Sequence, residues 1–419
     1  MSESEITPKA ETMHLPLSIA AVTIAFVNAI TPSLHAEPLP IEQSVDVVID
    51  KAISERRIVG AVVLVANKGR IVYSRAAGYA DREKGDLMQK DSIFRLASMT
   101  KPLVSAAALR LVEQGKLDLQ SPVARWLPDF RPRLQDGASP DITIHHLLTH
   151  TAGLSYGFLE PEGGPYHQAG ISDGLDTGPS LEENLHRIAS VPLAYAPGAG
   201  WRYSVALDVL GGVLSAAADQ SLPEIVREHV TGPLQMEDTR FLVTDPARLA
   251  TPYQDGQPQP VRMAEQAIVP IGDGAARFSP GRALDADAYP SGGAGMTGTA
   301  QDFMRFLLSL REGGRSILKP QTTALMMRDQ TGPEAQTQGP GWGFGYGWAV
   351  LDQPALAKTP QGEGTIQWGG AYGRSWFFDP VHDVAVVALT NTAFEGMSGA
   401  FPREIRDAVY EGLSLAGSR

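Results

Sequence analysis

Ser98 and Lys101 are spaced so that they could form a nucleophile and its activating base. Side chains at positions i and i+3 lie on the same face of a helix, so the hydroxyl and the ammonium can approach each other there. Pro102 belongs near a helix entrance, where the helix dipole favours developing negative charge. A lysine with a lowered pKa can help a serine attack a carbonyl carbon. Taken alone, however, the pattern favours a helix N-cap serine beside an exposed lysine.

Tyr203 is a second candidate for proton transfer. It stands directly before a helical pattern that begins at Val205. A tyrosine fixed at a helix start can serve as a base or a proton shuttle if a neighbouring cation lowers its pKa. The commoner role of such a residue is a core ring with its hydroxyl at the surface, and this alternative stays open here.

A glycine pair lies in the third stretch, which reads Trp368, Gly369, Gly370 and Ala371. It comes at the end of an expected strand, where paired glycines let a substrate approach the backbone closely. The N–H group of Ala371 could then join that of Ser98 as a two-donor oxyanion hole. A β-turn or a bulge is the alternative explanation.

Taken in order, S-x-x-K, Y-S-x and W-G-G resemble the motifs of the serine β-lactamase and penicillin-binding-protein superfamily. Within that superfamily the chain looks like the class C-like esterases, the family VIII carboxylesterases. Connecting stretches match as well: Phe94 to Ala97, Leu147 to Leu154 and Gly292 to Met296. The resemblance covers roughly residues 40–415.

The resemblance implies a role for each matched position. Ser98 would be the acylated nucleophile and Lys101 its activating neighbour. Tyr203 would be the general base for acylation and would later activate water for deacylation. The N–H group of Ala371 would complete the oxyanion hole, in the segment where β-lactamases carry K-T-G.

Two positions depart from the β-lactamase pattern. Val205 stands where the asparagine of Y-x-N would be, and Trp368 replaces the lysine of K-T-G. In β-lactamases these polar groups help bind the amide and the carboxylate of the drug. Their loss favours neutral, apolar acyl groups and leaves at most a weak β-lactamase side activity.

The chain is therefore predicted to be a serine hydrolase that cleaves short-chain carboxylic esters through an acyl-enzyme on Ser98, without a metal or an organic cofactor. Alternatives on the same scaffold are a β-lactamase or DD-peptidase-type amide hydrolase and an acyltransferase. A catalytically silent peptidoglycan- or peptide-binding module is the alternative from another class. Such a module would need none of Ser98, Lys101 and Tyr203, so their joint presence argues against it.

Two further motifs match chemistry that their context does not support. The G-x-S-x-G around Ser155 would need a buried strand before it to be a nucleophile elbow, and a helical patch stands there instead. The stretch from Gly293 to Gly298 resembles a dinucleotide fingerprint but also lacks a preceding strand.

Histidines and aromatic residues allow weaker inferences. His146 and His150 have the spacing of H-E-x-x-H, yet Leu147 occupies the position of the glutamate. We expect His145, His146 and His150 to pack or to form hydrogen bonds rather than to bind zinc. The glycine-rich aromatic run from Trp342 to Trp348 could line an acyl pocket or form a strand edge packed on a helix, and both interpretations stay open.

The elements that must position these residues follow from hydrophobic periodicity. Helices are predicted at 41–56, 98–114, 142–149, 181–188, 205–217, 301–310 and 403–415, and strands at 61–66, 71–74, 346–351, 364–368, 375–378 and 384–389. Residues 250–292, rich in Pro, Gln, Gly and Asp, predict a long surface excursion.

This order predicts an α+β fold, in which an antiparallel sheet is built from both chain termini and flanked by helices, with an inserted, mainly helical domain. The resemblance likewise implies a class C β-lactamase-like fold. The predicted division is a signal peptide or disordered leader over residues 1–36, a sheet domain made of 37–115 and 290–419, and a helical insertion over 116–289.

Composition limits the partners. With 35 basic and 47 acidic residues the net charge is −12, which disfavours nucleic acid, and the absence of cysteine excludes disulfides, thiolate metal sites and a cysteine nucleophile. We expect a small-molecule ester as the partner.

The beginning of the chain suggests a location. The apolar stretch from Leu15 to Val27 resembles a signal peptide and is too short for a stable membrane span, which needs about 20 apolar residues. Glu3, Glu5 and Glu11 outnumber Lys9 where a signal peptide carries positive charge. We expect a periplasmic or secreted protein, with the cytoplasm as the alternative.

Overall fold

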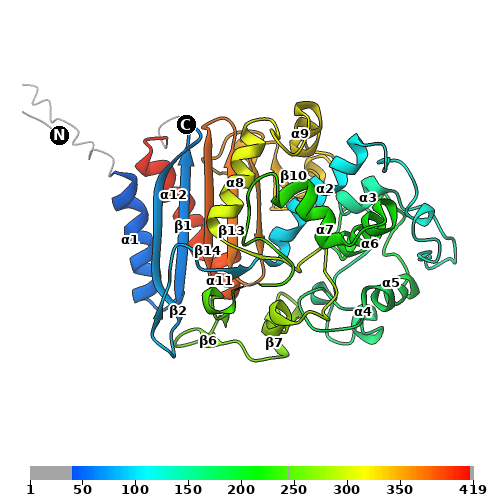
Figure 1. The fold of residues 1–419 in the computed structure, drawn as a ribbon, viewed down its shortest axis with the longest axis horizontal. Helices are drawn as coiled ribbons and strands as arrows, with labels where there is room; N and C mark the ends of the chain where they lie inside the picture. Colours follow the sequence, from blue (N-terminus) through cyan, green and yellow to red (C-terminus); the bar gives the residue numbers. More distant parts are fainter. Residues whose placement is uncertain (1–39, 244, 416–419) are drawn as a thin grey trace, which may run out of the picture. The chain divides into compact units, whose positions relative to one another are not determined.

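Strands from the two ends of the chain form one antiparallel sheet of eight strands (Figure 1). Its order is β10-β11-β12-β13-β14-β1-β2-β3, so the N-terminal strand β1 (Gly60–Asn67) lies beside the C-terminal strand β14 (Val384–Thr390). This arrangement belongs to a computed structural model that describes residues 40–243 and 245–415. The predicted α+β fold with a sheet built from both termini is confirmed.

The remaining strands of this sheet are β2 (Arg70–Asp81), β3 (Asp86–Leu87), β10 (Trp342–Phe344), β11 (Ala349–Leu351), β12 (Ile366–Gly370) and β13 (Arg374–Asp379). The longer helices are α1 (Ile41–Ser54), α2 (Thr100–Glu113), α5 (Leu181–Ser190), α6 (Ala206–Ala218), α8 (Ala300–Arg311), α9 (Pro320–Met327) and α12 (Ala400–Gly412). Short helices are α3 (Ile144–Leu148), α4 (Pro165–Gln168), α7 (Leu222–Val226), α10 (Pro354–Ala357) and α11 (Ala393–Met397).

The sheet separates two apolar layers because side chains alternate along its strands. In β1, Val62 and Leu64 join the large core toward α2 and α8, whereas Val63 and Val65 join a smaller core toward α1 and α12. Figure 1 shows α1 and α12 on one face of the sheet and α8 on the other. The site described below is built on the side of the large core.

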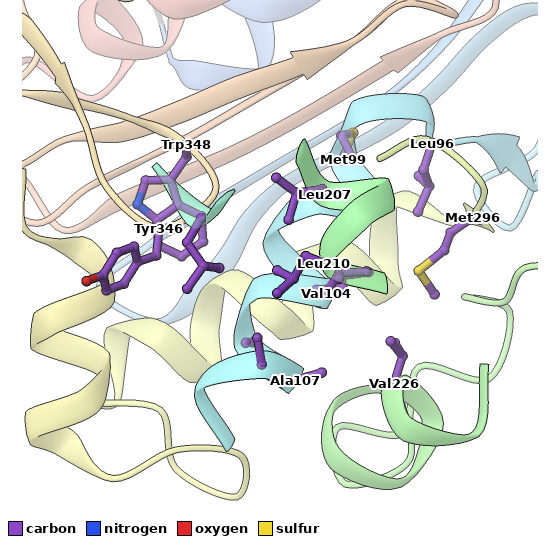
Figure 2. Packing of buried hydrophobic residues seen from close by; sticks show 14 of the residues in the cluster. Leu96, Met99, Val104, Ala107, Leu207, Leu210, Val226, Met296, Tyr346 and Trp348 are labelled. Atoms are coloured by element: carbon purple, nitrogen blue, oxygen red, sulfur yellow. The ribbon is translucent and has the colours of Figure 1, made fainter. Parts of the chain in front are cut away.

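Helix α2 lies inside the protein rather than on its surface. Nearly all of its residues from Thr100 to Leu111 are buried. Figure 2 shows Val104 of α2 close to Leu207 and Leu210 of α6, so the two helices pack directly on each other. This contact places the start of α2 beside the start of α6, where the lysine and tyrosine motifs lie.

Two expected elements differ from the structure. The strand expected over 346–351 begins only at Ala349, because Gly347 adopts a positive φ of 107° and lies in the bend between β10 and β11. The expected surface excursion over 250–292 contains two small hairpins, β5 (Tyr253–Gln254) with β6 (Val261–Arg262) and β7 (Ala267–Ile271) with β8 (Gly274–Phe278). The second hairpin is not a pure surface feature, since Val269 and Phe278 are buried.

The described residues lie in one compact unit, so the division into a sheet domain and a helical insertion stays a prediction. The predicted leader over residues 1–36 lies outside the described residues. Within the described part of the chain, no helix has the length and apolar character needed to cross a membrane.

Candidate active site

Ser98 lies in a single 3-10 turn, η1 (Ala97–Met99), that leads directly into α2. The residue before it, Ala97, is fully buried and has a φ of +46°, in the left-handed region that residues other than glycine rarely adopt. Strained backbone of this kind persists only where the surrounding structure enforces it, and it gathers at functional sites. The turn leaves Ser98 partly exposed while its neighbours are buried.

Lys101 reaches Ser98 from the protein interior. Its side chain is fully buried, and its Nζ lies 3.2 Å from the Ser98 Oγ and donates to the Gly293 carbonyl oxygen at 2.8 Å. Burial lowers the pKa of Lys101 to about 7, although the nearby carboxylates of Asp208 and Asp173 favour the charged form. A substantial fraction of Lys101 is therefore neutral near pH 7 and able to accept a proton.

Tyr203 lies beside both Ser98 and Lys101. Its hydroxyl accepts a hydrogen bond from the Trp368 Nε1 at 3.2 Å, and the Lys101 Nζ lies 4.6 Å from its ring centroid. Burial raises the pKa of Tyr203, and hydrogen bonds with Ser98 and Trp368 oppose that rise. The phenol is thus the stable form at neutral pH.

The W-G-G-A stretch lies next to the serine turn. Strand β12, which ends with Gly369 and Gly370, packs against η1. A Cβ at Gly370 would collide with the carbonyl oxygen of Leu96, so only glycine allows the strand to approach this closely. The structure therefore brings the residues of all three motifs together, as the sequence predicts.

A cavity of about 440 Å³ opens in front of Ser98. Tyr203, Trp368, Gly369 and Ala371 also line it, whereas Lys101 stays behind the serine. Most of the other lining residues are apolar, namely Tyr156, Phe158, Leu159, Leu175, Trp201, Ile271, Ala276, Ala294, Phe394 and Met397. Such a cavity has the size of a small-molecule site and prefers uncharged groups.

Two charged side chains, Asp173 and Arg202, take part in this lining. The Asp173 carboxylate accepts the backbone N–H groups of Gly157 at 2.8 Å and Phe158 at 3.1 Å. Burial raises the pKa of Asp173 to about 7, and the neighbouring carboxylate of Asp176 adds to the rise. Arg202 is exposed at the edge of the cavity.

Sequence reasoning missed several of these residues. Asp173 follows no motif, and only the fold brings it to the serine. Asp208, fully buried in α6, belongs to none of the three motifs, yet its carboxylate interacts with the charge of Lys101. Gly293 belongs to a connecting stretch and to the unsupported dinucleotide pattern, yet its carbonyl oxygen accepts a hydrogen bond from the Lys101 Nζ. The hairpin residue Ile271 was expected in a surface excursion and instead lines the cavity.

The other candidate motifs supply no nucleophile or metal ligand to the cavity, although Tyr156 and Ala294 from them line it. Ser155 is buried, and its hydroxyl donates to the Tyr156 carbonyl oxygen at 3.3 Å. The segment before it holds helix α3 rather than a strand. Among the described residues no group of His, Asp or Glu is arranged to hold a metal ion. His146 instead accepts the backbone N–H of Thr143 at the start of α3, at 3.1 Å.

The aromatic run over 342–348 forms a strand edge packed on helices. Trp348 is buried, with its ring centroid 6.4 Å from that of Phe306 in α8. Gly347 lies against Ser105 of α2. None of the residues in this run lines the cavity, so the packing interpretation is the correct one.

Comparison with known proteins adds independent information. The family model described as Beta-lactamase matches residues 43–410. Esterase EstB from Burkholderia gladioli is 55% identical over 370 residues, covering 87% of this chain and 94% of the relative. Lovastatin esterase from Penicillium rubens is 29% identical over 366 residues, covering 80% of this chain and 89% of the relative.

A solved structure is similar throughout. The protein described as "EstCE1, a hydrolase with promiscuous acyltransferase activity" is 50% identical and superimposes with a TM-score of 0.86. The match covers 88% of this chain and 98% of that chain.

Proposed function

Because the chain belongs to the β-lactamase family, we propose that it is a serine hydrolase that cleaves short-chain carboxylic esters through an acyl-enzyme on Ser98. The observation that carries the proposal is the position of the Ser98 Oγ. It lies 3.2 Å from the Lys101 Nζ, interacts with the Tyr203 hydroxyl and faces an apolar cavity. The esterase name of the relative that is 55% identical supports the same reaction.

Acylation begins when the Ser98 Oγ bonds to the ester carbonyl carbon and passes its proton to the Lys101 Nζ. The carbonyl oxygen becomes an oxyanion, for which we assign the N–H groups of Ser98 and Ala371 as donors. When the bond to the alcohol oxygen breaks, the Tyr203 hydroxyl protonates that oxygen. Lys101 then returns the proton to the Tyr203 phenolate, which the Trp368 N–H stabilises.

The pKa shifts favour Lys101 over Tyr203 as the first proton acceptor. Burial lowers the pKa of Lys101 to about 7, which leaves a substantial fraction of the amine neutral near pH 7. Burial raises the pKa of Tyr203, so its phenol is better suited to deliver a proton than to accept one. In deacylation, Tyr203 relays a proton from the attacking water to Lys101, and the released Ser98 Oγ takes the proton back.

Acyl transfer to an alcohol is a second candidate activity. The walls of the cavity are mainly apolar, so an alcohol with a hydrocarbon chain gains burial there that water does not. The similar structure EstCE1 is described as a hydrolase with promiscuous acyltransferase activity. We infer that alcohols compete with water for the acyl-enzyme.

A panel of p-nitrophenyl esters from acetate to octanoate tests the proposal. A burst of p-nitrophenol equal to the enzyme concentration is expected with the wild type. Added butanol should divert part of the acyl group into a butyl ester. Absence of both a burst and turnover on every ester would contradict the proposed function.

A double-mutant cycle tests the shared proton path. Lys101→Ala and Tyr203→Phe should each reduce kcat severely, and the double variant should be little worse than either single variant, since both serve one proton transfer. Losses that multiply would show that the two residues act independently.

A further inference from the structure

His150 lies beside Tyr203 in the protein interior. It is fully buried, and its ring centroid lies 4.8 Å from that of Tyr203. Its φ is +56°, in the left-handed region that Asn, Asp and His tolerate better than most residues. The structure therefore holds this histidine in an uncommon backbone conformation in contact with the proposed proton shuttle.

Two hydrogen bonds tie the residues on either side of Tyr203 to His150. The His150 carbonyl oxygen accepts the backbone N–H of Arg202 at 3.1 Å. Its ring Nδ1 accepts the backbone N–H of Ser204 at 3.2 Å. His150 thus contacts the backbone on both sides of Tyr203, and its ring packs against the tyrosine ring.

The Ser204 contact determines the tautomer of His150. A backbone N–H can only donate, so Nδ1 carries no proton and the neutral ring is protonated on Nε2. Burial and the charge of Lys101 lower the pKa of His150 well below its ordinary value. The ring is therefore neutral near pH 7, and Nδ1 is an acceptor there.

We propose that His150 is the positioning residue of Tyr203, holding the phenol at hydrogen-bonding distance from Ser98 through its two contacts with the flanking backbone. The inference rests on the proposed function, since it assigns Tyr203 a role in proton transfer. His150 is not itself a catalytic residue, because it does not line the cavity and its Nδ1 is engaged by the backbone N–H and the hydroxyl of Ser204, the latter at 3.1 Å. Its Nε2 is buried without a hydrogen-bond partner among the described residues.

Two substitutions separate positioning from simple filling of space. His150→Asn keeps an acceptor at the position of Nδ1 and a residue that tolerates a positive φ, but it removes the ring. His150→Phe keeps a ring of similar size and removes the acceptor. If His150 only fills space, His150→Phe should have the higher kcat of the two variants. If His150 positions Tyr203, His150→Asn should have the higher kcat.

Steady-state hydrolysis of p-nitrophenyl butyrate measures the effect. We expect His150→Phe to lower kcat about 100-fold, the loss that a misplacement of about 1 Å can cause, with KM changed less than about twofold. His150→Asn should retain kcat within about tenfold of the wild type. His145→Phe is the matched control, because His145 contacts the Tyr346 hydroxyl at 2.9 Å, outside the site, and should leave kcat unchanged.

A double-mutant cycle then asks whether the loss acts through Tyr203. In a Tyr203→Phe background, His150→Phe should cost less than about twofold more, because the group that it positions is already lost. Losses of kcat that multiply in the double variant would overturn the proposal. A lower kcat in His150→Asn than in folded His150→Phe would also overturn it. If His150→Phe does not fold, His150→Ala removes the acceptor without added bulk, and wild-type kcat in that folded variant would overturn it equally.

Failure of this inference can be told apart from failure of the proposed function. A wild-type enzyme that gives neither a burst nor turnover on any ester would refute the hydrolase mechanism. A wild-type burst together with an unchanged kcat in folded His150→Phe would refute only the positioning role.

Discussion

At the scale of single residues, Ser98 and Ser155 differ in what surrounds their hydroxyls. Ser98 faces the cavity beside a buried lysine, whereas Ser155 is buried and bonded to a neighbouring carbonyl. We predict that Ser98→Ala lowers kcat by on the order of 10⁵ and abolishes the burst. Ser155→Ala should change kcat by less than about tenfold, below 1.4 kcal/mol of barrier. The reverse result would refute the choice of nucleophile.

Asp173 lines the cavity with a pKa that burial also raises to about 7, but it takes no part in the proposed proton transfer. The pH dependence should therefore report Lys101. Only its neutral form accepts the Ser98 proton, so kcat/KM should rise with pH through an acid limb near 7, the pKa of the buried lysine. The Asp208 carboxylate favours the charged lysine, and Asp208→Asn should therefore move the limb to lower pH. Asp287→Asn, at an exposed position, should leave it in place. A limb near or above the ordinary tyrosine value of about 10 would instead assign the first proton transfer to Tyr203.

Esters should be better substrates than β-lactams. Trp368 provides no cation for the carboxylate of the drug, and a charge-assisted hydrogen bond is worth roughly 1.5–3 kcal/mol. Asp173 adds a carboxylate to the same cavity. We predict that kcat/KM for p-nitrophenyl butyrate exceeds that for a chromogenic cephalosporin by at least about 100-fold, roughly 2.7 kcal/mol. Equal efficiencies would show that another cation, such as Arg202, replaces the missing lysine.

Local spacing made some of these residues predictable. Ser98 and Lys101 share a helix start, and their separation alone indicates that their side chains can meet. Asp173 reaches the cavity through a loop held by the backbone N–H groups of Gly157 and Phe158. Such a contact depends on tertiary folding and has no counterpart in residue spacing.

At the scale of elements, the β7–β8 hairpin forms one wall of the cavity. Ile271, near its turn, lines the cavity, whereas Ile268 on the same strand is 59% exposed. Ile271→Ala should make room for longer acyl chains, each added methylene being worth about 0.8 kcal/mol, or about fourfold. We predict that the ratio of kcat/KM for the octanoate ester to that for the acetate ester rises at least about fourfold. Ile268→Ala should leave the ratio unchanged, and an unchanged ratio in Ile271→Ala would exclude the hairpin from substrate selection.

Runs of apolar residues predict strands of the main sheet, but they do not predict this hairpin. The segment around it is rich in Pro, Gln, Gly and Asp, which is typical of loops. What stabilises the hairpin is packing of Val269 and Phe278 in a small cluster with Tyr372 and Ala393, residues more than 90 positions away in the chain. Contacts at such a separation leave no local pattern.

At the scale of the whole molecule, the sheet separates the large core that carries the site from a smaller core on its other face. We expect the smaller core to contribute to stability and not to catalysis. Phe401 of α12 is fully buried in the smaller core, on the face of the sheet away from the cavity. Phe401→Ala should lower the free energy of unfolding by about 3–5 kcal/mol, measured by denaturant titration, while kcat at 25 °C stays within about twofold. Val47→Ala, at a position of α1 that is 56% exposed, should change the free energy of unfolding by less than about 0.5 kcal/mol. A large loss of kcat in folded Phe401→Ala would contradict this separation.

The pairing of β1 with β14 also has a consequence for synthesis on the ribosome. Strand β1 leaves the exit tunnel early, but its partner begins only at Val384. At about 5–20 residues per second, the intervening chain takes roughly 15–60 s to make. During that interval one edge of the β1–β2 hairpin lacks its native neighbour, and unpaired edges of this kind promote aggregation. We therefore expect the nascent chain to depend on chaperones until β14 has been made.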